Sequence, residues 1–421
     1  MPLNPLDVKR PGKPTRAAYL RRRVVAGIFL VLVAGVGIYV PVALAAPLNA
    51  ATASVAGWAE PTPRAPQELD TPEIGSSAIG AVGFDGLLAQ SGSSDPVAIA
   101  SISKVITALV VLEAKPLTTD VDGPTITFSA ADAALYGKYV KVLGKVEPMR
   151  AGVEMTEREA LEVVLISSAN NYTEALAGWA FGSQQAFVDA AAMWIASHGL
   201  ASTTIVEPTG MSPRNVSSAA DLVRLGQLAL QHPVVSAIVA SPVATVPYIG
   251  DIENTNELLG IGGIDGIKTG TLDEAGSCLL FSTEYVVGTS TITVVGVVLG
   301  GVDHESVDAA VTALLAGVST GFRQVTLTQP GQQFATFTTE WDDTSRAVAT
   351  EAATVVVWSD APITATVELS EVEQTRAGAS AGRVEFSVDG RAITVPLAFD
   401  DPIDDPGQWW RIFHPLDEIL P

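Results

Sequence analysis

A serine and a lysine with the spacing needed for nucleophilic catalysis stand in the run Ser101-Ile102-Ser103-Lys104. If Ser101 opens a helix, Lys104 lies one turn further along the same face, where its amine can reach the serine oxygen. A buried lysine loses part of its preference for the charged form, so a neutral amine can accept the serine proton. The pair predicts acyl transfer through Ser101, although a helix-capping serine is the simpler explanation of this motif alone.

Two further tripeptides carry polar groups suited to the same chemistry. Ser168-Ala169-Asn170 follows an apolar helical stretch at 161–166, and Lys268-Thr269-Gly270 lies just before an apolar strand. Alone, the first is typical of a helix-to-loop cap and the second of a surface turn. The intervals are 67 residues from Ser101 to Ser168 and 100 residues from Ser168 to Lys268.

The ordered set Ser-x-x-Lys, Ser-x-Asn and Lys-Thr-Gly resembles the active site of penicillin-recognising serine enzymes. Within this class the chain is most similar to the low-molecular-mass D-alanyl-D-alanine carboxypeptidases, peptidase family S11, over about residues 75–323. Segments that resemble the family occur at 100–109, 168–171, 208–211, 215–222 and 265–270. The resemblance implies a serine-type carboxypeptidase that removes the terminal D-alanine from peptidoglycan stem peptides ending in D-Ala-D-Ala. It also implies β-lactams as covalent inhibitors and no cofactor.

The resemblance assigns the bond-breaking roles to three side chains and two backbone groups. Ser101 would attack the carbonyl between the two D-alanines and form an acyl-enzyme that water hydrolyses. Lys104 would be the base, and Ser168 would relay a proton towards the leaving amine. The backbone N–H groups of Ser101 and Thr271 would form the oxyanion hole, where one lost donor costs about 3 kcal/mol of barrier.

The same resemblance implies that four residues bind the substrate. Asn170 would hydrogen-bond the peptide backbone of the substrate. Lys268 and Thr269 would bind the terminal carboxylate by charge and by hydroxyl donation. Gly270 would keep the strand open to the incoming ligand.

One expected cation is absent from the sequence. Family members often carry an arginine after the Lys-Thr-Gly strand that helps to hold the carboxylate, but no lysine or arginine occurs between Lys268 and Arg323. The nearest candidate is His304, and an imidazole is mostly neutral at pH 7. We therefore expect weaker discrimination for a free terminal carboxylate than in members with the arginine.

Two alternatives stay open from the residues alone. A β-lactamase shares the three motifs and adds a glutamate that activates the deacylating water, and Glu207 lies at a suitable distance after Ser168. The following Pro208-Thr209-Gly210 resembles the carboxypeptidase loop instead, which makes Glu207 a loop-surface carboxylate. The other alternative is a peptidoglycan-binding module that kept the fold and lost turnover, against which the intact motifs argue.

The composition indicates an exported globular protein of two or three domains. Of the 421 residues 48% are apolar and 17% are charged, and the formal net charge is -22. So acidic a surface repels nucleic acid, which excludes that partner. Cys278 is the only cysteine, so no intrachain disulfide can form, and the four histidines lie too far apart to suggest a metal site.

The N-terminal region predicts export. A basic segment at 1–23 precedes an apolar run at 24–46 long enough to span a membrane, with the basic end in the cytoplasm. A retained transmembrane anchor is our preferred interpretation, and the alternative is a signal peptide cleaved after Ala43-Leu44-Ala45, with Pro41 ending the helix. Residues 47–72, rich in Ala, Pro and Thr, are expected to form an extended tether.

The remaining chain predicts two domains. Residues 73–323 alternate short strands with helices, and the resemblance implies the α/β (α+β) serine β-lactamase/penicillin-binding-protein-like transpeptidase fold. Residues 324–401 predict a small all-β sandwich, with Asp389-Gly390 as the turn of a hairpin between 384–388 and 392–397. The tail at 402–421 carries Trp409, Trp410, Ile412 and Phe413, which we expect to cap a small core rather than to contact a membrane.

Overall fold

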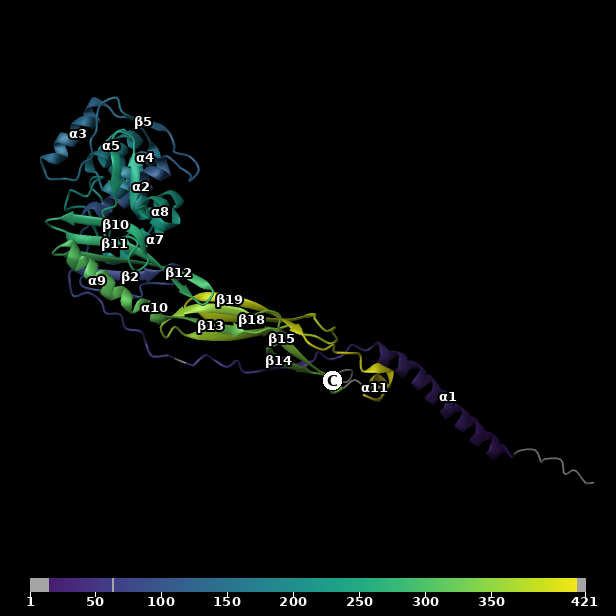
Figure 1. The fold of residues 1–421 in the computed structure, drawn as a ribbon. Helices are drawn as coiled ribbons and strands as arrows, with labels where there is room; N and C mark the ends of the chain where they lie inside the picture. Colours follow the sequence, from purple (N-terminus) through teal and green to yellow (C-terminus); the bar gives the residue numbers. More distant parts are fainter. Residues whose placement is uncertain (1–14, 63, 415–421) are drawn as a thin grey trace, which may run out of the picture.

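A mixed α/β domain, a β domain and one long helix follow one another along an extended molecule (Figure 1). The computed structural model describes residues 15–62 and 64–414, so residues 1–14 of the basic leader and 415–421 of the tail lie outside the described residues. The helix α1 (Arg16–Ala45) stands at the end of the β domain that is remote from the α/β domain (Figure 1).

The α/β domain is organised around one antiparallel five-stranded sheet, in the order β10-β11-β12-β2-β3. The strands are β2 (Ser76–Ala81), β3 (Ala89–Ser91), β10 (Ile264–Leu272), β11 (Gly276–Val287) and β12 (Ser290–Gly301). The two long central strands are apolar runs because both faces of the sheet are covered. Helices α9 (His304–Ala316) and α10 (Val318–Gly321) cover one face, and α7 (Ala219–Gln231) covers the other.

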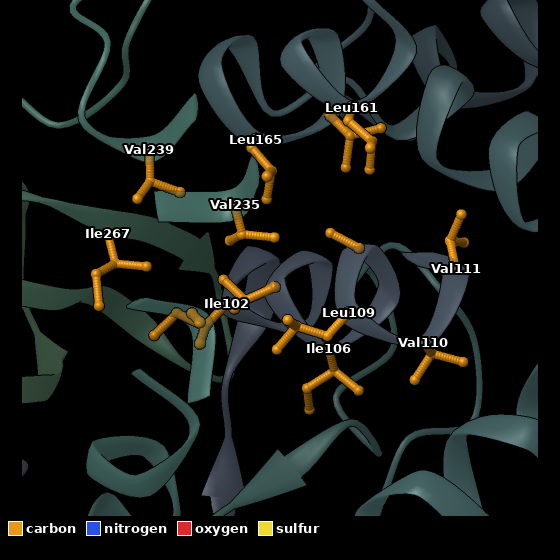
Figure 2. Packing of buried hydrophobic residues seen from close by; sticks show 14 of the residues in the cluster. Ile102, Ile106, Leu109, Val110, Val111, Leu161, Leu165, Val235, Val239 and Ile267 are labelled. Carbon is orange, nitrogen blue, oxygen red and sulfur yellow. The ribbon is translucent and has the colours of Figure 1, made fainter. Parts of the chain in front are cut away.

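Helix α7 packs closely on the sheet because Gly226 faces it without a side chain. A Cβ at Gly226 would lie 2.5 Å from Val295 Cγ1. Helix α2 (Ser103–Ala114) lies behind the sheet edge as the most buried helix of the domain. Figure 2 shows Ile102 and Ile106 in the same apolar cluster as Val235 of α8 (Pro233–Val239) and Ile267 of β10.

The helical region beside α2 holds the second predicted motif. It contains α3 (Ala130–Val140), α4 (Glu157–Glu162), a π-helical turn (Val163–Ser167), α5 (Asn170–Phe181) and α6 (Gln184–Ser197). Three short antiparallel strand pairs and one isolated bridge, Thr204 to Val216, complete the described part of the domain. The pairs are β4 (Val97–Ala98) with β7 (Val216–Ser217), β5 (Thr125–Thr127) with β6 (Glu154–Thr156), and β8 (Val243–Val246) with β9 (Gly250–Glu253).

The β domain confirms the predicted hairpin. A six-stranded sheet in the order β1-β14-β15-β19-β18-β17 packs against the pair β13-β16 around one apolar core. The strands are β13 (Phe322–Thr328), β14 (Gln333–Thr338), β15 (Thr344–Ala349), β16 (Ala353–Trp358), β17 (Ile363–Leu369), β18 (Ser380–Val388) and β19 (Arg391–Phe399). Asp389 and Gly390 join β18 to β19 with positive φ of 48° and 76°, as a two-residue turn of this type requires.

The predicted tether at 47–72 needs a correction. Its first part forms β1 (Thr52–Val55), which pairs with β14 from Thr52 opposite Thr338 to Val55 opposite Ala335. Trp58 then packs edge-to-face on Phe386 of the β-domain core. The chain is therefore attached to the β domain directly after α1, through a strand whose partner lies almost 300 residues away and leaves no local signal.

The N-terminal helix and the tail also differ from expectation. Pro41 does not end α1, which continues to Ala45. In α11 (Gly407–Phe413), Trp410 packs on Trp341, but Trp409 and Phe413 are 75% and 69% exposed and cap no core. Helix α11 instead lies against the end of α1, where the Tyr39 hydroxyl donates to the Ile412 carbonyl at 2.7 Å.

Candidate active site

A cavity of about 640 Å³ lies between strand β10 and the helical region, and the three predicted motifs meet at it. Its lining includes six of the predicted site residues: Ser101, Ser168, Asn170, Thr269, Gly270 and Thr271. Lys104 and Lys268 are not in the lining, and their side chains are fully buried behind it. The structure thus brings all eight predicted residues to one place, from segments up to 170 residues apart.

Ser101 and Lys104 form the centre of the site. Ser101 lies in a 3₁₀ turn (Ala100–Ile102) that leads directly into α2, so both residues are on nearly the same helical turn, as predicted. The Lys104 Nζ donates to Ser101 Oγ at 2.8 Å, to Asn170 Oδ1 at 2.7 Å and to the Thr209 carbonyl at 2.7 Å. Three acceptors match the three donors of an ammonium group.

Burial changes the acid–base character of Lys104. Desolvation lowers the pKa of Lys104 to about 7, partly opposed by the negative charge of Glu207, while Lys145 lowers it further. A lysine with this pKa is neutral in a large fraction of molecules at neutral pH. The residue can therefore accept a proton from Ser101, which an ordinary surface lysine cannot do.

Ser168 and Asn170 come from the end of the π-helical turn. Ser168 adopts a left-handed conformation, with φ of 65°, which stops the helix and turns the chain into the cavity wall. Asn170 is the first residue of α5, and its Oδ1 accepts a hydrogen bond from the Lys104 ammonium group. The predicted contact of Asn170 with substrate is thus left to its amide nitrogen.

The Lys268 ammonium group is hydrogen-bonded to two hydroxyl groups and does not line the cavity. The residue is 1% exposed, and its Nζ donates to Thr255 Oγ1 at 3.2 Å and to Thr269 Oγ1 at 3.4 Å. The Thr255 and Thr269 hydroxyls bond each other at 2.6 Å. Burial, followed by the charges of Lys104 and Lys145, lowers the pKa of Lys268 well below its usual value.

Strand β10 passes close to the nucleophile turn. It is an edge strand of the sheet, so only one side of its backbone pairs with a neighbour. A Cβ at Gly270 would lie 3.1 Å from the Ile99 carbonyl and 3.4 Å from the Ser101 nitrogen. Glycine therefore allows the strand to approach the turn, which brings the predicted oxyanion-hole residues Ser101 and Thr271 to the same side of the cavity.

Glu207 does not lie on the loop surface, as the sequence suggested, but faces inward. Its carboxylate accepts from the Thr209 N–H and Oγ1 and from the Gly210 N–H, all at 2.7 Å, and from Asn215 Nδ2 at 3.1 Å. It is not among the cavity-lining residues. Glu207 thus shapes the loop whose Thr209 carbonyl receives Lys104, which is a positioning role.

We expect Glu207→Gln to slow acylation about tenfold or more, since the amide would bring an N–H group against the backbone N–H donors of the loop. Stopped-flow measurement of the rate of acylation by a penicillin checks this prediction. The rate at which the acyl-enzyme is then lost is measured in a second experiment. Asp221→Asn, on α7 away from the cavity, is the matched control, with unchanged rates expected. Slower deacylation with unchanged acylation would instead support the β-lactamase role.

The sequence interpretation missed several residues of the cavity wall. Glu253 ends β9, Thr255 and Glu257 follow that strand, and Lys145 comes from the loop between α3 and β6. The polar run from Glu253 to Glu257, between two apolar segments, was the available signal. It was inconclusive because polar runs are usually solvated loops.

A serine bonded to a buried lysine, an Asn on that lysine and a Lys-Thr-Gly edge strand define the class of penicillin-recognising serine enzymes. Within it, the family model for D-alanyl-D-alanine carboxypeptidase, peptidase S11, matches residues 84–302. The chain belongs to this family and is a serine-type D-Ala-D-Ala carboxypeptidase. The resemblance, the fold and the enzyme class inferred from the sequence are confirmed.

Relatives in this family cover both main activities. A D-alanyl-D-alanine endopeptidase of Pseudomonas aeruginosa is 33% identical over 53% of this chain and 72% of its own length. The D-alanyl-D-alanine carboxypeptidase DacF of Bacillus subtilis is 27% identical over 54% of this chain, and the matched region spans 58% of that relative. A crystal structure of PBP3 from Streptococcus pneumoniae, a peptidoglycan synthesis regulatory factor, aligns with a TM-score of 0.60 and 24% identity, over 79% of this chain and 100% of that chain.

Proposed function

We propose that this enzyme removes the terminal D-alanine from peptidoglycan stem peptides through an acyl-enzyme on Ser101. The observation that carries the proposal is the buried Lys104 amine, 2.8 Å from Ser101 Oγ, with its pKa lowered to about 7. Serine needs such a base at neutral pH. β-Lactams would acylate the same oxygen and inhibit the enzyme covalently.

The reaction follows from the positions of the groups around Ser101. Ser101 Oγ attacks the carbonyl between the two D-alanines while Lys104 takes its proton, and the N–H groups of Ser101 and Thr271 bind the oxyanion. Ser168, which lines the same cavity, passes a proton to the leaving amine, and the terminal D-alanine departs. Water then adds to the ester, the shortened peptide leaves, and the Ser101 hydroxyl is restored.

Recognition of the substrate divides between the two walls of the cavity. Asn170 offers its amide nitrogen to the peptide backbone from one wall. Thr269 offers its hydroxyl to the terminal carboxylate from the other, and Lys268 polarises that hydroxyl from behind. Gly270 leaves the space between them open to the peptide.

The experiment that tests this function uses two substrates. Purified full-length protein is incubated with a stem pentapeptide and with a cross-linked dimer of stem peptides, and products are identified by mass spectrometry. Release of free D-alanine from the pentapeptide is the expected result. Cleavage of the dimer alone would establish the endopeptidase activity instead, which the 33% identity to an endopeptidase makes the second candidate.

We propose that α1 is a retained membrane anchor and that the catalytic domain lies outside the cytoplasm. The helix is 30 residues long and has a mean hydropathy of 2.5 over an 18-residue stretch, and Arg21, Arg22 and Arg23 precede its apolar part. Exposed Trp409 and Phe413 lie beside its other end, where aromatic side chains favour the membrane surface. Intact mass of the membrane-extracted protein tests this: a mature N-terminus near residue 46 would show cleavage.

A further inference from the structure

Two aliphatic side chains stand exposed at the rim of the catalytic cavity. Val142 and Leu143 belong to the cavity lining, yet Leu143 is 95% exposed and Val142 is 56% exposed. Single exposed apolar residues are common on protein surfaces and need no explanation by themselves. This pair differs because Ser168 and Asn170 line the same cavity.

The backbone of Leu143 lies in the left-handed region, with φ of 55°. This conformation crowds a bulky side chain, and glycine or asparagine usually occupies it at the end of a helix. Leu143 follows the end of α3, where its N–H donates to the Val140 carbonyl at 3.2 Å. The glycine of this turn comes one residue later, at Gly144, whose φ is not positive. The leucine at 143 therefore costs folding stability, and backbone strain of this kind is typical of functional sites.

The segment 142–145, called the lip below, is fixed to both neighbouring helices. The Gly144 N–H donates to the Tyr139 carbonyl of α3 at 2.9 Å, and the Lys145 carbonyl accepts from the Asn170 N–H of α5 at 2.8 Å. A Cβ at Gly144 would lie 2.7 Å from Asn170 Nδ2, so the glycine is needed for this close approach. The lip thus holds its leucine one residue from the contact with Asn170. A contact surface fixed in this way loses little conformational freedom when a ligand binds.

We propose that Leu143, supported by Val142, binds the aliphatic part of the side chain that precedes the two D-alanines in the substrate. This inference rests on the proposed function, in which Asn170 binds the peptide backbone and Thr269 binds the terminal carboxylate from the opposite wall. The residue before the two D-alanines lies on the acyl side of the cleaved bond, away from that carboxylate. Its side chain is therefore the part of the peptide that meets the lip.

The test measures kcat/KM for two acetylated peptides, X-D-Ala-D-Ala, in which X is L-norleucine or L-alanine. Norleucine adds three aliphatic carbons and no charge, so the charged groups of the cavity, such as Lys145 and Glu257, do not enter the comparison. The full chain in detergent should cleave the norleucine peptide about tenfold more efficiently, because the lip removes part of this chain from water. A ratio near one in the wild type would overturn the inference.

Two substitutions at position 143 separate the side chain from the backbone. Leu143→Asn removes the aliphatic surface and suits a left-handed backbone better. The ratio should therefore fall towards one, while the melting temperature stays equal or rises. Leu143→Met keeps an aliphatic side chain and should keep the wild-type ratio. An unchanged ratio in Leu143→Asn, or a lost preference together with a lower melting temperature, would contradict the proposed contact.

Tyr248 provides a matched control away from the cavity. It also has a left-handed backbone, with φ of 66°, its side chain is 74% exposed, and it is not in the cavity lining. Tyr248→Asn should relieve the same kind of backbone strain and leave the ratio of the two peptides unchanged. A lower ratio in Tyr248→Asn would mean that relaxed backbone strain, and not the leucine contact, sets the preference.

Failure of the proposed function gives a different result. If neither peptide releases D-alanine, the carboxypeptidase proposal fails, but recognition of the side chain can still be measured as binding. Calorimetry with Ser101→Ala should give a dissociation constant about tenfold lower for the norleucine peptide. The double variant Ser101→Ala with Leu143→Asn should bind the two peptides equally. Equal affinities in Ser101→Ala alone would overturn the inference, whatever reaction the enzyme catalyses.

Discussion

Replacing Ser101 with alanine should abolish covalent labelling by a fluorescent penicillin and lower D-alanine release by about 10⁴-fold or more. The substitution removes the oxygen that Lys104 contacts at 2.8 Å, and no acyl-enzyme can then form. The cavity and the residues proposed to bind the oxyanion and the terminal carboxylate stay in place. Binding of a D-Ala-D-Ala peptide should therefore persist, which calorimetry can measure beside gel fluorescence.

The same motif supplies a matched control for Ser101. Ser103 lies two residues on, is fully buried and accepts from Asn215 Nδ2 at 3.1 Å, and it is not in the cavity lining. Ser103→Ala should keep the label, with some loss of stability from the lost hydrogen bond to Asn215. Retention of the label in Ser101→Ala, or its loss in a folded Ser103→Ala, would assign the nucleophile to another residue.

Replacing Lys104 with methionine should lower the acylation rate by about 10³-fold or more while leaving the protein folded. Methionine has nearly the same length and suits a buried site, so removing the ammonium does not create an unpaired charge. In the wild type the base must be neutral. Because burial lowers the pKa of Lys104 to about 7, acylation should rise as the pH increases through 7 and should be lost below it.

The pH profile distinguishes a base from a structural lysine. In Lys104→Met the residual acylation should no longer rise through pH 7, as measured by penicillin labelling at short times between pH 5.5 and pH 9. Lys115→Met, on the exposed residue that follows α2, is the control and should keep the wild-type profile. An unchanged profile in Lys104→Met would mean that another group takes the proton.

The β domain separates the catalytic domain from α1. Strand β1 joins α1 to this domain directly, and the catalytic domain follows at its far end (Figure 1). The Phe322–Trp358 contact and the cation–π contact of Arg391 with Phe84 lie where the two domains meet. A paired sheet between α1 and the active site holds their separation better than the unpaired, extended tether expected at 47–72 could.

The positions of the reactive groups along the chain were readable from the sequence because they depend on local geometry. Three residues of helical spacing suffice to bring Lys104 next to Ser101. The two-residue turn at Asp389-Gly390 was equally readable, since few residues accept positive φ. The apolar run of α1 was identified by its length and composition.

Contacts between distant segments could not be predicted in the same way. The pairing of β1 with β14 and the contacts of Lys104 with Asn170 and Thr209 depend on partners remote in sequence. A short strand such as Thr52–Val55 has no turn signal to indicate its partner. The exposure of the Trp409 side chain likewise depends on where α11 packs against α1.

The spacing of Ser101 and Lys104, the order of the three motifs and the lack of a lysine or arginine between Lys268 and Arg323 could all be read from the sequence. The complete burial of Lys104 against Asn170 and Thr209, and the contact of His304 with Thr271, arise only when the chain folds. The physical reason is that covalent spacing sets which neighbours a residue has within one helical turn. Desolvation, which converts a lysine into a base, comes from chain segments that only folding brings together.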